Sequence, residues 1–149
     1  MDPTQKFSKI LVAIDGSENS MIAADFAIEI AKRNDAELVA LHVSHVPSTE
    51  LYLTPPKQYK EFIKEYDQDF EGWVGKISKK AKERQVKAKA DVIKDAPNVV
   101  AAIVDYADKK NINLIVVGTR GRSGFKKLLL GSVATGIVMY ASCPVMVIK

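Results

Sequence analysis

Residues 9–17 decide the fold and read Lys9-Ile10-Leu11-Val12-Ala13-Ile14-Asp15-Gly16-Ser17. The run up to residue 14 is apolar without alternation, which suits a parallel strand covered by helices on both faces. The three residues after it form a turn and helix-start signal. A helix is expected next over residues 18–33, with Asn34 as its C-terminal stop. This strand–turn–helix unit predicts an α/β fold.

The rest of the chain repeats the same alternation of strands and helices. Strands are expected at residues 37–43, 87–93, 114–117 and 145–148, the second of these at a sheet edge. A loop is expected over residues 44–56. Helices are expected at residues 57–85 and 132–141, and between them a further helix with Pro97 in its first turn. We predict a single α/β domain over residues 1–149. It is a doubly wound five-stranded parallel sheet of strand order 3-2-1-4-5, with helices on both faces.

Two of the expected helices carry specific expectations about packing. In the helix after Pro97, the buried stripe is expected to contain Val100, Ile103, Val104 and Ala107. In the helix over residues 57–85, the apolar stripe contains Phe62, Tyr66, Phe70, Trp73, Ile77 and Ala81. Gly72 and Gly75 each cost about 1 kcal/mol relative to Ala in a helix, which leaves open a bend or break near them.

Composition places the chain among ordinary globular proteins. It has 149 residues, of which 47% are hydrophobic and 27% charged, with a net charge of +4. That charge does not by itself indicate nucleic-acid binding, and the lysines of residues 76–89 are interpreted as a solvated helix face. Cys143 is the only cysteine, and no stretch approaches the roughly 20 apolar residues of a membrane helix. We therefore expect a cytoplasmic protein with no membrane partner.

The segment after the fourth strand has the composition of a phosphate-binding loop. It contains Gly118, Gly121, Gly124 and Gly131, with four cations at residues 120, 122, 126 and 127 and no acid. Glycines allow close backbone approach, and exposed N–H groups can form an anion nest. Ser132 is expected to cap the last helix and to bond a phosphate there. The spacing matches neither the P-loop nor the G-x-G-x-x-G pattern.

In a sheet of this order, ligands bind beyond the carboxyl ends of the strands where the winding reverses. The reversal lies between the first and fourth strands, so Asp15 and Gly118 are expected at the same crevice. Taken alone, Asp15 reads as a turn residue or helix cap, and the glycine segment as a surface connection. Their convergence at one crevice favours the binding interpretation for both.

The glycine spacing Gly118-x2-Gly121-x9-Gly131-Ser132 resembles the G-x2-G-x9-G-[ST] signature of the universal stress protein family, in its ATP-binding branch. Residues 10–17, 114–118 and 143–147 resemble the family's first, fourth and last strands, so the resemblance covers nearly the whole chain. Thr119 and Arg120 depart from the family pattern, because many relatives carry Ser and His at those positions.

The resemblance implies a role for each matching position. Asp15 would contact the ribose or a phosphate-bound Mg²⁺, and the backbone of Val43 would bond to adenine. The ATP contacts predicted from the loop and its cations are Gly118, Arg120, Gly121, Arg122, Gly131, Ser132 and Val133. The resemblance also implies a homodimer through the last strand, Val145, Met146, Val147 and Ile148, whose apolar edge would otherwise favour aggregation.

Three functions follow as alternatives. The first is an ATP-binding, dimeric regulatory module of the stress response. The second is a slow ATPase or phosphoryl or nucleotidyl transferase, although the sequence offers no P-loop lysine and no evident second acid beside Asp15. The third is a nucleotide-free, chaperone-like dimer, against which the intact glycine signature argues. His42 is interpreted as a packed strand residue and Cys143 as a small hydrophobe rather than as catalytic groups.

Overall fold

A five-stranded parallel sheet lies at the centre of the molecule. The computed structural model describes residues 2–44, 56–119 and 130–149. The strands are β1 (Lys9–Ala13), β2 (Glu37–Val43), β3 (Ala88–Ile93), β4 (Leu114–Gly118) and β5 (Val145–Ile148). Their order is β3-β2-β1-β4-β5 and every pairing is parallel. The predicted sheet and strand order are confirmed.

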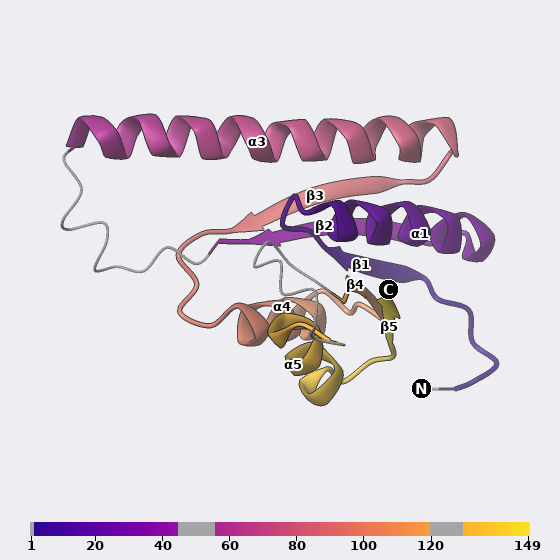
Figure 1. Ribbon diagram of the computed structural model, residues 1–149. Helices are drawn as coiled ribbons and strands as arrows, with labels where there is room; N and C mark the ends of the chain where they lie inside the picture. The colour runs from indigo at the N-terminus through magenta and orange to yellow at the C-terminus, as the bar shows by residue number, and fades with distance from the viewer. Residues whose placement is uncertain (1, 45–55, 120–129) are drawn as a thin grey trace.

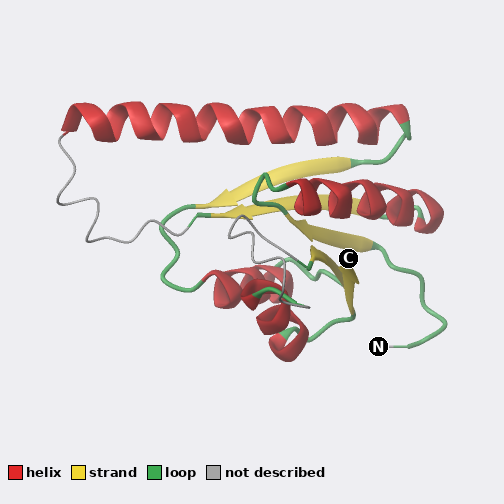
Figure 2. Ribbon diagram, viewed as in Figure 1, coloured by secondary structure: helices red, strands yellow, loops and turns green. Residues whose placement is uncertain are grey.

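Two helices cover each face of the sheet. α1 (Glu18–Asn34) and α3 (Pro56–Glu83) lie on one face, and α4 (Val99–Lys109) and α5 (Ser132–Tyr140) lie on the other (Figures 1 and 2). Successive residues of β1 enter opposite cores: Ile10 and Val12 pack under α1, whereas Leu11 packs against the α4 side. All three are fully buried, which is why the strand is apolar without alternation.

α1 is fixed at both ends by local hydrogen bonds. Its N-cap is Ser17, whose Oγ accepts the Ser20 N–H at 3.1 Å. At the other end Asp35 adopts a left-handed conformation (φ 54°), and its N–H bonds to the carbonyls of the last turn. Asn34, predicted as the stop, is the last helical residue, and its Nδ2 donates to Ile30 O at 2.9 Å. The residue that ends the helix is therefore one position later than predicted.

α3 runs for 28 residues without a break. The break that the sequence left open near Gly72 and Gly75 is absent, and both glycines are exposed, with open space where a Cβ would stand. Among the described side chains of α3, the buried apolar ones are Ile77 and Ala81, both in the second half of the helix. The Phe62 side chain lies outside the described part of the structure. The first turns project past the carboxyl ends of β2 and β3 (Figure 1).

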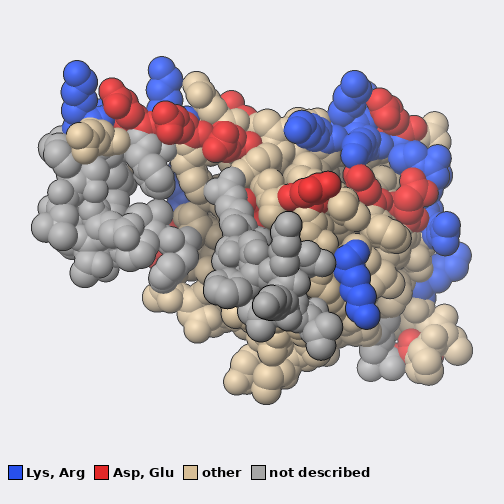
Figure 3. All heavy atoms as spheres, in the orientation of Figure 1, with Lys and Arg blue, Asp and Glu red and all other residues tan. Residues whose placement is uncertain are grey.

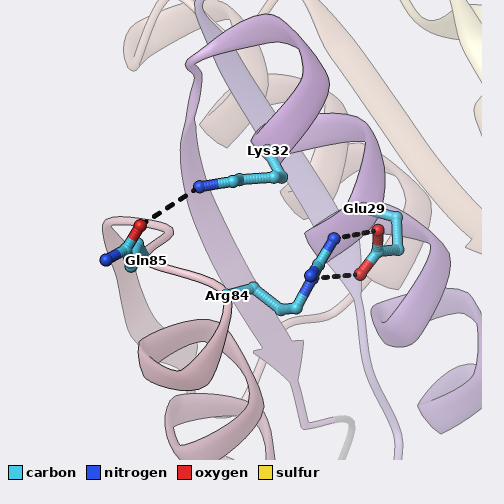
Figure 4. Close-up of polar contacts among 4 residues, drawn as sticks. All are labelled: Glu29, Lys32, Arg84 and Gln85. Atoms are coloured by element: carbon cyan, nitrogen blue, oxygen red, sulfur yellow. Dashed lines mark hydrogen bonds and ion pairs between the residues drawn. The ribbon is translucent and has the colours of Figure 1, made fainter.

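Polar contacts join the turn that directly follows α3 to α1. Arg84 donates twice to the Glu29 carboxylate, at 2.7 and 2.9 Å, and Lys32 Nζ reaches Gln85 Oε1 at 3.5 Å (Figure 4). Along this surface, basic and acidic side chains are mixed (Figure 3). Within the described ranges, none of the helices has both the length and the apolarity to cross a membrane.

α4 begins later than the sequence indicates. Pro97 was expected in its first turn, but the N-cap is Asn98 and the helix begins at Val99. Asn98 has an extended backbone (φ −141°), and its side chain accepts the Ala101 N–H at 2.9 Å, so this cap determines the start. Ile103 and Ala107 are buried as expected, whereas Val100 and Val104 are only half-buried.

Candidate functional site

A pocket of about 220 Å³ lies at the carboxyl ends of β1, β2 and β4, beside the start of α5. Its apolar wall includes Leu41, Val99, Ile103 and Val117. The predicted contacts that line it are Asp15, Val43, Gly118, Gly131, Ser132 and Val133. The structure thus brings together residues from four separate segments, at the point where the winding of the sheet reverses.

Asp15 stands on the turn between β1 and α1. Its Oδ1 accepts the Ser17 N–H at 2.9 Å, and its own N–H donates to Ser20 Oγ at 3.3 Å. Asp15 is therefore a turn residue in fact, and it also lines the pocket. The second carboxylate oxygen, Oδ2, takes no part in the bond to Ser17, so the turn does not use up the whole group.

Gly118 and Thr119 form the wall on the β4 side. A Cβ at Gly118 would collide with the side-chain oxygen of Asn19, from the first turn of α1, so a larger residue here would require the Asn19 side chain to move. Thr119 is buried, and its N–H donates to Ile148 O at 2.9 Å. The Thr119 carbonyl accepts the Gly131 N–H at 2.6 Å. These bonds fix both chain segments that flank residues 120–129.

α5 begins at the pocket, but not with the predicted cap. Ser132 is the first helical residue, and the N-cap is Gly131, which is extended (φ −66°, ψ 163°) and has no side chain to cap with. The expectation that Ser132 caps the helix is wrong, because the backbone turns helical one residue earlier than a Ser132 cap requires. The N–H groups of Ser132 and Val133 belong to the first turn, where a helix supplies no acceptor of its own. This end carries the positive side of the helix dipole.

Arg120, Gly121 and Arg122 lie outside the described residues, so the pocket as described lacks three of the predicted contacts. Sequence reasoning in turn missed Ser20 and Thr119, which are both buried and both line the pocket. Nothing in the local pattern distinguishes Ser20 from an ordinary first-turn residue. Only its position beside Asp15 in the folded chain brings it to the pocket.

The donor set around Asp15 limits the kind of metal that fits. Within residues 2–44, 56–119 and 130–149, no three His, Cys, Asp or Glu side chains gather to hold a metal ion. Asp15 is the one carboxylate among the described residues that line the pocket. Mg²⁺ bound to a nucleotide needs only one or two protein carboxylates, because phosphates and water fill the other positions. The residues present therefore fit a phosphate-bound Mg²⁺ and not a metal held by protein alone.

Fold and pocket together define a doubly wound α/β protein with a crevice at its topological switch point. The universal stress protein family model matches residues 6–149. A universal stress protein of Methanocaldococcus jannaschii is 38% identical over 146 residues, covering 96% of this chain and 82% of the relative. Universal stress protein YxiE of Bacillus subtilis is 36% identical, covering 96% and 99%. The chain belongs to the universal stress protein family.

Solved structures agree with this assignment. Universal stress protein UspA from Lactobacillus plantarum superposes with a TM-score of 0.76 at 25% identity, covering 98% of this chain and 100% of that one. Two more distant structures share the fold and hold adenine nucleotides. One is a universal stress protein from Archaeoglobus fulgidus in complex with dAMP (20% identity, TM-score 0.69, covering 97% and 100%). The other is a family member from Arabidopsis thaliana with AMP bound (21%, 0.69, covering 95% and 91%).

Proposed function

We propose that this protein binds ATP with Mg²⁺ at the carboxyl ends of β1 and β4, and acts as a nucleotide-dependent dimeric regulatory module. One observation carries the proposal: every predicted nucleotide contact that lies within the described residues lines the same pocket. These residues come from segments far apart in the sequence, and the fold brings them to one place. The adenine nucleotides held by two proteins of the same fold support an adenine ligand.

The two ends of the pocket suit the two ends of ATP. The apolar side chains of Leu41, Ile103 and Val117 would contact the base, and the backbone of Val43 would supply its hydrogen bonds. The phosphates would lie at the start of α5. Because Gly131 N–H already donates to Thr119 O, we assign the phosphate contacts of this turn to the N–H groups of Ser132 and Val133.

Charge favours a triphosphate over a monophosphate. Arg120 and Arg122 follow Gly118 closely in the sequence, and Gly121 between them has no side chain to block the phosphates. Asp15 would coordinate a Mg²⁺ bound to those phosphates. The proposed role is occupancy-dependent regulation, with hydrolysis slow at most. Rapid phosphoryl transfer needs a positioned base or water-orienting group, and Asp15 Oδ1 is already bonded within its own turn.

The dimer would form through β5. This strand pairs with β4 on one side only, and Met146 is 37% exposed. Val138, Met139 and Tyr140 of α5 are exposed large apolar residues close to it in sequence. Pairing of β5 with its copy in a second subunit would satisfy the open backbone edge and cover Met146.

Isothermal titration with ATP and Mg²⁺ tests the proposal. The wild type should bind, and Gly121→Asp should abolish binding by placing a carboxylate against the phosphates. Gly72→Asp is the matched control, because Gly72 lies exposed on α3 with no neighbours. Absence of heat with the wild type would refute ATP binding. Equal affinity in Gly121→Asp and the control would refute the assignment of the phosphate end.

A further inference from the structure

The turn that carries Asp15 is backed by a cluster of aromatic rings. His42 of β2 is buried, and its ring centroid lies 5.5 Å from that of Tyr66, 5.9 Å from Phe70 and 5.3 Å from Trp73. The three aromatic partners all belong to α3. The cluster therefore joins the carboxyl end of β2 to the helix that crosses over it.

His42 also bonds to the turn itself. Its Nδ1 lies 2.7 Å from the carbonyl oxygen of Ile14, the residue directly before Asp15. A carbonyl oxygen can only accept, so Nδ1 must carry the proton and donate it. This bond fixes the peptide that leads into Asp15, whose side chain lines the pocket.

Trp73 closes the other side of the same turn. Gly16, the residue after Asp15, has a positive φ of 78°, and the Trp73 indole occupies the space where a Cβ would stand. The residues on either side of Asp15 are thus both linked to α3. Ile14 is linked through His42, which packs against the α3 rings, and Gly16 contacts Trp73 directly. The position of its carboxylate depends on α3 as well as on the turn's own hydrogen bonds.

We propose that His42 and Trp73 are positioning residues for Asp15, and that they couple occupancy of the pocket to the packing of α3. The coupling arm of this inference rests on the proposed nucleotide site. Coupling between two positions is reciprocal. Whatever stabilises the turn of Asp15 therefore also stabilises the packing of α3 against that turn. The first turns of α3 project past the sheet, where a partner could detect such a change (Figure 1).

The positioning arm is tested without nucleotide, by amide hydrogen exchange. Asp15 and Ser17 amides donate the bonds that define the turn, to Ser20 Oγ and Asp15 Oδ1. His42→Phe keeps an aromatic ring but removes the donor to Ile14, and should speed exchange of these two amides about five- to tenfold. His42→Asn retains a donor near the Nδ1 position and should restore most of the protection. Tyr106→Phe, which removes one hydrogen bond on the opposite face of the sheet, should leave both amides unchanged.

The coupling arm is tested with ATP and Mg²⁺. Trp73 is the only tryptophan, so the tryptophan fluorescence reports the surroundings of this one indole, which contacts both His42 and Gly16. Binding to the wild type should change that fluorescence, and His42→Phe should weaken the calorimetric affinity about five- to tenfold, with His42→Asn close to wild type. Unchanged exchange of the Asp15 and Ser17 amides in His42→Phe would overturn the inference, whatever ATP does. If ATP binds the wild type without changing the Trp73 fluorescence, and binds His42→Phe with unchanged affinity, the coupling is overturned. If the wild type does not bind ATP but His42→Phe exchanges these amides faster, the proposed function is rejected and the positioning role is upheld.

Discussion

At the scale of single residues, Gly16 is where backbone conformation, core packing and the candidate site meet. Its φ of 78° is costly for any residue with a side chain, and the Trp73 indole fills the position of the missing Cβ. Glycine at this position therefore lets the turn that carries Asp15 pack directly against Trp73. Gly72 is the opposite case, a helical glycine surrounded by open space.

Substitution of these two glycines by alanine should have opposite effects. Gly16→Ala combines a strained backbone with overpacking against Trp73, and should lower the free energy of unfolding by about 2 kcal/mol or more. Gly72→Ala should raise it by up to about 1 kcal/mol, because alanine favours the helix. Urea unfolding of both variants measures the difference. A Gly16→Ala variant as stable as the wild type would mean that Trp73 does not pack against the turn as described.

Tyr106 gives a second residue-scale prediction, through pH. Burial, with its hydrogen bond to Asp91 Oδ2 (3.1 Å) and the charge of that carboxylate, raises the pKa of Tyr106 to about 12. An unfolded tyrosine titrates near pH 10. The folded state favours the neutral phenol, so this stabilisation is complete below pH 10 and is lost as the pH rises from 10 towards 12.

Tyr106→Phe should therefore be less stable than the wild type by about 1 kcal/mol at pH 7, because the bond to Asp91 is lost. The gap should shrink or reverse between pH 10 and 12, since only the wild type has this phenol to ionise. Urea unfolding of both proteins across that range measures the gap, and the subtraction removes the titration of the lysines. A constant gap would contradict the raised pKa of Tyr106.

At the scale of elements, the contacts between α1 and α3 show how a long helix is held mainly by its second half. Ile77 and Ala81 enter the core, and Arg84, directly after the last helical residue, forms a bidentate pair with Glu29. The pair lies at the surface, where water and salt screen the attraction. The hydrogen bonds from Arg84 lower the pKa of Glu29, so the stabilisation by this pair is complete above the ordinary pKa of a glutamate and is lost as the pH falls below it, through the lowered pKa of the folded state.

Arg84→Met should consequently lower stability slightly at neutral pH in low salt, and the loss should disappear at 1 M salt or at acidic pH. Thermal unfolding at two salt concentrations measures this. Lys79→Met, which removes an exposed α3 charge that forms none of the ion pairs described, serves as a control for the general removal of one positive charge. An equal loss at both salt concentrations would indicate that the packing of the arginine stem, not its charge, holds the helices together.

The strands of this fold could be predicted from the sequence more accurately than the starts of its helices. Strands such as Leu114–Gly118 are recognisable because both faces are buried and the apolar run has no gaps. Helix starts were harder to place, because competing signals stand side by side: Asn98 caps α4 although Pro97 also suits a first turn, and Gly131 stands at the α5 cap position next to Ser132. Such choices depend on backbone conformation, which the residue types alone do not determine.

The candidate site was predictable to a similar degree. Asp15 and Gly118 follow strands on either side of the reversal in winding, so their shared crevice follows from topology. Ser20 and Thr119 could not be assigned, because each reaches the pocket through its three-dimensional position and not through a motif. The contacts of His42 and Trp73 with the turn depend on how α3 crosses β2. No local pattern encodes that crossing.

At the scale of the whole molecule, the two sheet edges differ in character. β3 exposes Lys89 and Asp91 at one edge, where charged side chains discourage pairing with other strands. β5 presents Val145, Met146 and Val147 at the other, without a charge. This asymmetry is the physical basis for placing the proposed dimer at β5.

Met146→Lys should therefore weaken the dimer by about tenfold or more, because it places a charge at the centre of the proposed interface. Sedimentation equilibrium measures the shift in association, and circular dichroism checks that the subunit stays folded. Ala90→Lys, an exposed position on β3, adds the same charge at the opposite edge and should leave association unchanged. A Met146→Lys protein that associates as well as the control would exclude β5 as the interface.

Thr119 bonds in two directions at once, by its N–H to Ile148 and by its carbonyl to Gly131. The last strand and the N-cap of the last helix are thus hydrogen-bonded to the same residue on the wall of the pocket. A displacement of the C-terminal strand that keeps this bond therefore moves the residue that borders the crevice. Any contact that reorients this edge of the sheet would therefore change the shape of the cavity, even though it touches none of the residues inside.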